Sequence, residues 1–280
     1  MFFLINKPSG ITSHDVIYRL RKVTGIKRIG HAGTLDPLAS GLMAVAVGND
    51  TRLLEYLVGL DKEYVCTFRL GATSTTYDSE GKIIEIENAP QITESQLKKV
   101  LREFTGDIYQ TPPIFSAVKI QGRKAYDYAR SGEIVNIPQR LITIFHLELT
   151  NFKYPEVTIK VHCSSGTYIR SLVHDIGKRL NSGAYITKLE RTKIGEASID
   201  QAINVDDFTK ESEQISFSQL RPDLLMYELS EQELMNVKQG KAISTKKSFQ
   251  SVVLGLYNKQ IVSVLEYDLN HSSLRPIKNL

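Results

Sequence analysis

Alternating apolar and polar positions along the chain predict a series of strands. In residues 64–70 the alternation places Tyr64, Cys66 and Phe68 on one face, which is the pattern of a strand that packs one side against a core. Residues 42–47 are apolar without interruption, which predicts a strand buried on both faces. Further strands are expected at 2–6, 82–87, 139–150, 156–163 and 184–193.

Other segments carry apolar residues at helical spacing. Four of them lie near the start of the chain: Val16, Ile17, Leu20 and Val23. Thr12 or Ser13, directly before them, can cap the helix that they predict. Longer helices are also expected at 94–104 and 167–180, and shorter ones at 52–57, 126–131 and 231–237. Because strands and helices do not alternate regularly, the pattern indicates an α+β fold on a mixed, largely antiparallel sheet.

The chain divides near its end. Arg221-Pro222 interrupts the regular patterning, and the 59 residues that follow contain one predicted helix and several short strands. We therefore expect a main domain over 1–221 and a small β-rich domain over 222–280.

Composition excludes several classes of protein. The 280 residues are 41% hydrophobic and 24% charged, which is typical of a globular protein, and no apolar run is long enough to cross a membrane. The first residues do not resemble a secretory signal, and the only two cysteines, Cys66 and Cys163, favour a reducing, cytoplasmic location. Because the histidines are scattered and no nucleotide-binding motif occurs, we expect no metal and no cofactor.

Positive charge is unevenly distributed. Residues 1–40 hold six basic and two acidic side chains, an excess of four that equals the net charge of the whole chain. A second basic cluster contains Lys119, Arg123, Lys124 and Arg130. Such clusters suggest a polyanionic partner such as nucleic acid, although solvated basic faces are a common alternative.

The segment 30–41 concentrates unusual residues. It places the carboxylate of Asp36 directly before Pro37, with glycines at 30, 33 and 41, ahead of the predicted buried strand. An aspartate before a proline often only starts a turn, so this segment alone leaves a structural role open.

Five motifs in order resemble the TruB family of tRNA pseudouridine synthases. They are Lys7-Pro8-Ser9-Gly10 with the Asp36 segment; Lys62-Glu63-Tyr64 with Thr76-x-Asp78-x-x-Gly81; Gln110-Thr111-Pro112-Pro113-x-x-Ser116-Ala117-x-Lys119; Gly166-Thr167-Tyr168-Ile169-Arg170; and Leu189-x-Arg191-Thr192-x-x-Gly195. The chain departs from common family residues at Met43, Ala44, Thr75, Glu190 and Ala197. In the small domain, Gln239-Gly240-Lys241-Ala242 resembles a PUA-type RNA-binding β-barrel.

The resemblance implies an isomerase that converts uridine 55 in the T-arm loop of tRNA to pseudouridine, without a guide RNA and as a monomer. It assigns the nucleophile to Asp36 and the partner guanidinium to Arg170, which we expect to keep the pKa of Asp36 low. Tyr64 would stack on the flipped base and help move its C5 proton. The remaining implied roles are base-pocket residues Tyr168 and Leu189, insertion into the RNA stack by His31, and phosphate contacts by Lys7, Lys119 and Arg123.

Two other functions compete with this interpretation. A non-catalytic chaperone could bind and refold tRNA on the same surface, but binding alone does not need a carboxylate aimed at an anionic partner. A phosphate-ester hydrolase could use Asp36, but the sequence places no second acidic metal ligand nearby. Taken alone, Tyr64, Tyr168 and Leu189 would be ordinary core residues, and His31 an ordinary surface residue.

Overall fold

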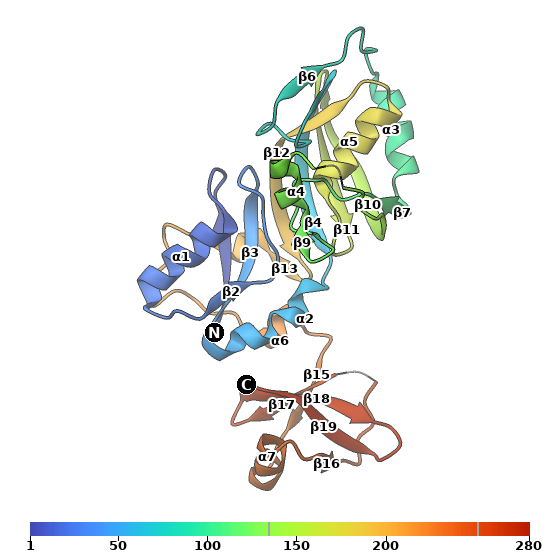
Figure 1. Ribbon diagram of the computed structural model, residues 1–280. Helices are drawn as coiled ribbons and strands as arrows, with labels where there is room; N and C mark the ends of the chain where they lie inside the picture. Colours follow the sequence, from blue (N-terminus) through green and yellow to red (C-terminus); the bar gives the residue numbers. More distant parts are fainter. Residues whose placement is uncertain (134, 251) are drawn as a thin grey trace.

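The computed structural model describes residues 1–133, 135–250 and 252–280, which form two domains joined near residue 221 (Figure 1). Among these residues, ten strands form the large sheet, in the order β14-β1-β3-β12-β4-β11-β10-β7, with β2 on β3 and β13 on β12. Its strands are β1 (Phe2–Lys7), β2 (Ile29–His31), β3 (Ser40–Val47), β4 (Lys62–Leu70), β7 (Gly106–Gln110), β10 (Arg140–Lys153), β11 (Glu156–Cys163), β12 (Ala184–Ile194), β13 (Ala197–Ser198) and β14 (Ile203–Asn204). Neighbouring strands are antiparallel except for β1 with β14 and β3 with β12.

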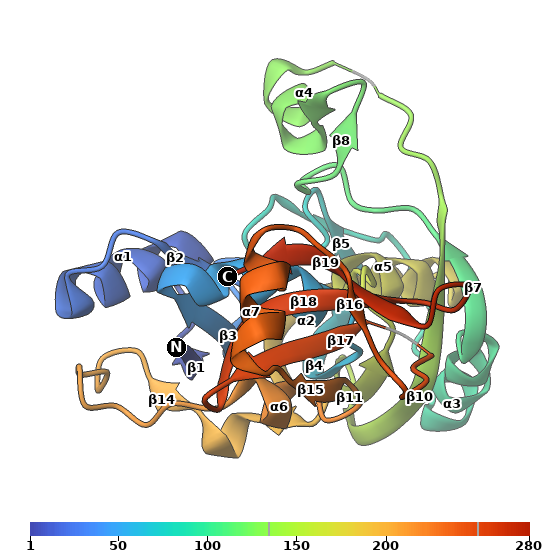
Figure 2. The same ribbon diagram turned by 90° about the horizontal axis from the view of Figure 1, so that it is seen from below.

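Helices cover this sheet, and two small hairpins extend from it. The helices are α1 (Ser13–Thr24), α2 (Glu55–Val58), α3 (Glu94–Glu103), α4 (Ala125–Ser131), α5 (Ile169–Arg179) and α6 (Phe217–Leu220), with short 3₁₀ turns at Gly48–Leu53 and Ile199–Gln201. The hairpins are β5 (Ala72–Ser74) with β6 (Ile83–Glu85), and β8 (Lys119–Ile120) with β9 (Arg123–Lys124). Figure 2 shows β8 and α4 standing out from the body of the domain.

The second sheet is built from the end of the chain. It contains β15 (Leu225–Glu228), β16 (Ile243–Ser244), β17 (Val253–Tyr257), β18 (Gln260–Asp268) and β19 (Ser273–Asn279), in the order β15-β17-β18-β19-β16, with α7 (Glu231–Lys238) beside it. The mixed, largely antiparallel α+β architecture and the β-rich small domain are confirmed. No helix among the described residues is long and apolar enough to span a membrane.

The predicted burial patterns are also confirmed. In β3, Met43 and Val45 enter one core, whereas Leu42 and Ala44 enter a second core on the opposite face. The second core also contains Leu254 of the small domain. The run 42–47 is therefore apolar throughout because both of its faces are covered, one of them partly by the small domain.

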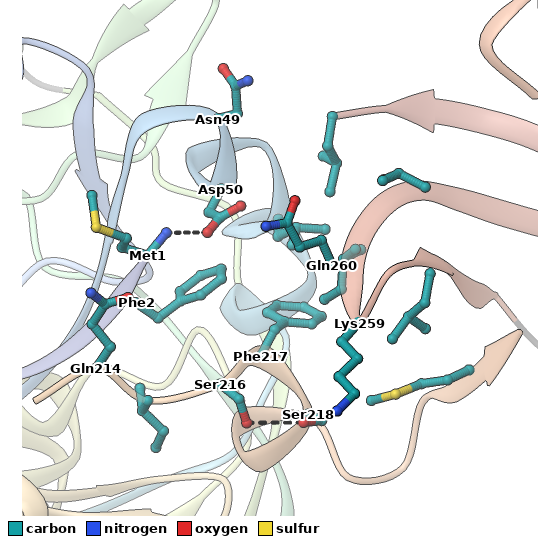
Figure 3. A pocket seen from close by; sticks show the side chains of 17 residues that line it. Met1, Phe2, Asn49, Asp50, Gln214, Ser216, Phe217, Ser218, Lys259 and Gln260 are labelled. Atoms are coloured by element: carbon teal, nitrogen blue, oxygen red, sulfur yellow. Dashed lines mark hydrogen bonds and ion pairs between the residues drawn. The ribbon is translucent and has the colours of Figure 1, made fainter. Parts of the chain in front are cut away.

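A cavity of about 580 Å³ lies between the two domains (Figure 3). Its floor includes Phe2 and Phe217, whose ring centroids are 5.2 Å apart. The amino terminus forms an ion pair with Asp50 at its edge, and Lys259 faces it from the small domain. This cavity is larger than the pocket around Asp36.

Two sequence expectations were incomplete. No strand was predicted between residues 25 and 41, but this part of the chain contains β2, whose residues pair with β3 from Ile29↔Val47 to His31↔Val45. The single helix expected at 52–57 is a 3₁₀ turn followed by α2. Three-residue strands and 3₁₀ turns are too short to carry a readable period, which explains both differences.

Candidate active site

Residues from all five motifs converge on one pocket of about 310 Å³. Its lining includes five of the residues singled out in the sequence: Asp36, Tyr64, Tyr168, Arg170 and Leu189. They come from the loop between β2 and β3, from β4, from the start of α5 and from β12. The pairing of β4 with β12, and of β12 with β3, brings these segments together.

The Asp36 loop is held by hydrogen bonds from the first helix and strand. The buried hydroxyl of Ser13 accepts from the Leu35 amide at 2.8 Å and donates to the Leu35 carbonyl at 3.0 Å. The amide of Gly10 donates to the Pro37 carbonyl at 2.8 Å. Thr12 caps α1 through a reciprocal capping box with Asp15, so the helix that carries Ser13 begins at a defined place. The loop conformation therefore depends on the motif at residues 7–13.

Arg170 connects the loop to the rest of the pocket. Its Nε lies 2.9 Å from Oδ2 of Asp36, and its Nη2 donates to Oδ1 of Asp36 at 3.3 Å. Nη2 also donates to the Phe115 carbonyl at 2.9 Å, and Nη1 donates to the Thr76 carbonyl at 3.1 Å. A second carboxylate, that of Asp78, lies 3.5 Å from Nη1. The guanidinium is 7% exposed, whereas the Asp36 side chain is 38% exposed and can contact a ligand in the pocket.

The expectation of a low pKa for Asp36 is wrong. Burial raises its pKa above the ordinary value; Arg170 opposes this shift, and the negative charge of Asp78 adds to it. The sequence identified the guanidinium but could not show how far protein atoms would displace water from the carboxylate. Arg170 therefore positions Asp36 and offsets part of its desolvation.

The three predicted base-pocket residues line the cavity. Tyr64 and Leu189 are 9% and 8% exposed, and both belong to the core as well as to the pocket wall. The backbone of Tyr168 is clamped by the buried side chain of Gln110, which donates to its carbonyl and accepts from its amide. Arg140 lies over the Tyr168 ring at 5.5 Å from its centroid. These side chains can therefore pack in the core and line the pocket at the same time.

Lys7 is not placed as expected. Its side chain is fully buried, and its Nζ donates to the carbonyls of Pro8, Ile11 and Pro37. Burial lowers its pKa to about 8, although Asp36 favours the charged form. In this position Lys7 supports the Asp36 loop from beneath, and the phosphate contact implied by the resemblance does not fit this burial.

His31 is not among the residues that line the pocket. It ends β2, its Nδ1 accepts from the Gly33 amide at 3.3 Å, and burial lowers its pKa. Lys119 is exposed on β8, three residues beyond the pocket residue Ser116. Arg123 on β9 forms an ion pair with Glu133 at 2.8 Å and lies over the Tyr128 ring. These partners lie in and after α4, and the Arg123 side chain is still 39% exposed.

Three buried groups, two in the pocket wall and one beside Arg170, received no role from the sequence. Arg191 is 2% exposed, and Asp78 also is buried. The Ser116 hydroxyl is buried without a hydrogen-bond partner among the described residues, and it lines the pocket with Arg191. All three belong to motifs quoted above, but only their convergence in space shows that they share a site.

The carboxylates of Asp36 and Asp78 lie beside the same guanidinium, and carboxylates are possible metal ligands. No group of three or more His, Cys, Asp or Glu residues within the described ranges could hold an ion, however. The two carboxylates instead share the Arg170 guanidinium. Such an arrangement holds one partly exposed carboxylate at a fixed place, ready to attack an electrophilic carbon.

Comparisons with known proteins agree with this geometry. Residues 21–169 match the family described as TruB family pseudouridylate synthase (N terminal domain). The chain is 46% identical over 214 residues to a tRNA pseudouridine synthase B of Prochlorococcus marinus, covering 76% of this chain and 68% of that protein. It is 37% identical to the Mesoplasma florum protein of the same name, covering 94% and 92%. A crystal structure of a Cbf5-Nop10-Gar1 complex contains a similar chain, with a TM-score of 0.74, 25% identity, and coverage of 99% and 84%.

The Ser13 contacts predict that this side chain stabilises the Asp36 loop. Ser13→Ala would leave the buried amide and carbonyl of Leu35 without their partner, so the free energy of unfolding should fall by about 1–3 kcal/mol. Hydrogen exchange at the Leu35 amide should accelerate. Urea denaturation and exchange mass spectrometry measure the two effects.

Ser9→Ala is the matched control. Ser9 also donates to the same loop, at the Leu38 carbonyl, but this bond is exposed and water can replace it. Its loss should change the unfolding free energy by less than about 0.5 kcal/mol. Equal effects of the two substitutions would contradict the proposed role of Ser13.

Proposed function

Because this chain belongs to the TruB family of pseudouridylate synthases, we propose that it isomerises uridine 55 in the T-arm loop of tRNA to pseudouridine. The observation that carries the proposal is the Asp36–Arg170 ion pair, which faces the same pocket as Tyr64. The enzyme class is an isomerase, and the finer assignments concern the position of the target, the mechanism and the roles of individual residues.

The chemistry needs a nucleophile and an enclosed pocket. The reaction breaks the N1–C1′ bond of uridine, turns the base over and joins C5 to C1′, so that nothing is oxidised or reduced. Asp36 attacks at C1′ of the ribose or at C6 of the uracil. Its exposed oxygen atoms face the pocket, while Arg170 prevents the carboxylate from rotating away.

The target base must leave the RNA stack to reach Asp36. Flipping a base costs a few kcal/mol, and stacking on an aromatic side chain offsets part of that cost. Tyr64 provides the ring and its hydroxyl relays the C5 proton; Tyr168 and Leu189 close the pocket around the base. His31, at the end of β2, fills the space that the base leaves in the RNA.

The partner is tRNA, bound without a guide RNA by a monomer in the cytoplasm. The relatives named tRNA pseudouridine synthase B support tRNA as the substrate, because the alignment with one of them covers 92% of its length. Lys119 and Arg123 on the projecting hairpin contact phosphates of the T-arm. Residues 1–221 act as the catalytic domain, and residues 222–280 as a PUA-like domain that docks the RNA.

Asp36→Asn tests the nucleophile and the target position together. The substitution removes the charge with little change of shape, so pseudouridine formation at position 55 should vanish. Binding should persist, because no phosphate contact is lost. The measurement is single-turnover incubation with an unmodified tRNA transcript, followed by site-resolved mapping of pseudouridine and a separate binding titration.

A transcript with cytidine at position 55 is the substrate control and should yield no product with the parent protein. If Asp36→Asn retained turnover, Asp36 would not be the nucleophile. If the parent protein refolded tRNA but formed no pseudouridine, the protein would be the non-catalytic chaperone instead.

Tyr64 separates stacking from proton transfer. Tyr64→Phe keeps the ring, so loss of rate must come from the hydroxyl. Tyr64→Leu also removes the stacking surface and should weaken capture of the flipped base by about a further 1–3 kcal/mol. We expect both variants to lose most pseudouridine formation while refolding of tRNA is nearly unchanged, as measured side by side on the same preparations. Normal turnover by Tyr64→Phe would remove the proton-relay role, and normal turnover by both would make Tyr64 a core residue only.

A further inference from the structure

Arg191 is a buried cation without a carboxylate partner. Its side chain is 2% exposed, its Nε donates to the Leu42 carbonyl at 2.7 Å, and its Nη2 donates to the Gly33 carbonyl at 3.1 Å. Among the described residues, no aspartate or glutamate oxygen forms an ion pair with it, in contrast to Arg170, which has two. Neutral carbonyls accept from two of its nitrogens but do not neutralise its charge, so the desolvation of this guanidinium is only partly compensated.

The position of Arg191 is set by the sheet. It lies directly across from Tyr64 in the pairing of β12 with β4, and next to Gly41 in the pairing of β12 with β3. A Cβ atom at Gly41 would lie 2.3 Å from the Arg191 carbonyl, and Gly41 has a φ of +108°, so only glycine allows this approach. The guanidinium is thereby held between the Asp36 loop and the proposed stacking residue, in the wall of the pocket.

The charge of Arg191 acts on the groups around it. Burial raises the pKa of the Tyr64 hydroxyl, and the neighbouring guanidinium of Arg191 opposes this shift. Burial, together with the positive charge of Arg191, lowers the pKa of Lys62 to about 8. The Lys62 ammonium is occupied by the carbonyls of Val58 and Leu60. On this side of the pocket, Arg191 is therefore the permanent positive charge available to a ligand that stacks on Tyr64.

We propose that Arg191 is a further catalytic residue, which stabilises the negative charge on uracil while the base is detached from the ribose. This inference rests on the proposed function. When the N1–C1′ bond breaks, its electron pair remains with the ring and is shared with the carbonyl oxygens. When C5 bonds to C1′, the ring supplies the electron pair and Asp36 is released from the carbon that it attacked. The C5 proton then leaves and N1 takes up a proton, so the isomer has the same atoms as the substrate. The anion exists only between these two events, and a preorganised guanidinium beside the stacking surface lowers its free energy.

Comparison of uridine with 5-fluorouridine tests this role. Fluorine at C5 withdraws electrons and stabilises the detached ring by itself, so a 5-fluorouridine substrate should depend less on Arg191. For uridine, Arg191→Gln should lower the single-turnover rate by about 100-fold, as removal of a donor to a developing anion does in other enzymes. For 5-fluorouridine at position 55 the same substitution should cost no more than about tenfold. Both rates are measured as conversion of the N-glycoside to a C-glycoside, by nuclease digestion and mass spectrometry.

Arg191→Lys keeps the charge and should recover most of the rate on uridine. If Arg191→Gln does not fold, the Lys variant provides the same test, because the comparison is between two substrates of one protein. Arg191→Lys should lose less rate on uridine than Arg191→Gln, and that loss should again be smaller on 5-fluorouridine. Ser13→Ala is the control, since it loosens the Asp36 loop without changing charge and should slow both substrates by the same factor. Thermal unfolding and tRNA binding are measured for each protein.

An equal loss on both substrates in the Arg191 variants would overturn the proposal and leave Arg191 with a structural role. Failure of the parent protein to convert uridine 55 would contradict the proposed function itself, and the two failures are therefore distinguishable.

Discussion

One buried guanidinium connects three separate segments around the candidate active site. Arg170 contacts Asp36 in the loop after β2, Thr76 and Asp78 in the turn after β5, and Phe115 in the segment that leads to the projecting hairpin. Its planar group presents donors in several fixed directions, which a lysine ammonium could not do with the same geometry. The position of α5 on the sheet therefore determines where Asp36 lies, and an error in that packing would displace three segments at once.

Charge around Asp36 creates a conflict between stability and function. Burial raises the pKa of Asp36, so folding loses free energy as the pH rises above the ordinary pKa of an aspartate. The loss is complete above the raised pKa, where the carboxylate is ionised in both states. That cost is absent at low pH, where the carboxyl is protonated whether or not the chain is folded. The cations Arg170 and Lys7 offset part of it, and Arg191 adds a positive charge whose benefit we assign to the reaction.

The sequence predicted most of the fold because the strands and helices that form its cores carry apolar residues at simple, regular spacings. Strand β3 is apolar at every position since two cores cover it, and β4 alternates because only one face carries the Tyr64, Cys66 and Phe68 series into the main core. The short strand β2 was missed, since three residues hold no period. The gathering of Asp36, Tyr64 and Arg170 was anticipated only through family motifs, and nothing local in the sequence relates residues 134 positions apart.

Burial was the quantity that the sequence could not supply. Lys7 lies in a basic N-terminal segment and was expected to reach a phosphate, but β1 carries it beneath the Asp36 loop, where three carbonyls surround it. The pKa of Asp36 was expected to be low because a guanidinium was foreseen and the loss of water was not. In the sequence, Arg191 is one position of a motif with no assigned role. The pairing of β12 with β4 places it across from Tyr64.

The central claim is that Asp36 is a desolvated but ionised nucleophile held by Arg170. Its most direct test is the titration of Asp36 in the free protein, followed by ¹³C NMR of Cγ-labelled aspartate, with Asp36→Asn used to assign the resonance. We predict a pKa above the ordinary aspartate value of 3.8, with the carboxylate fully ionised at neutral pH. A pKa at or below 3.8 would show that Arg170 outweighs burial, and a carboxyl that is still protonated at neutral pH would contradict its role as the nucleophile.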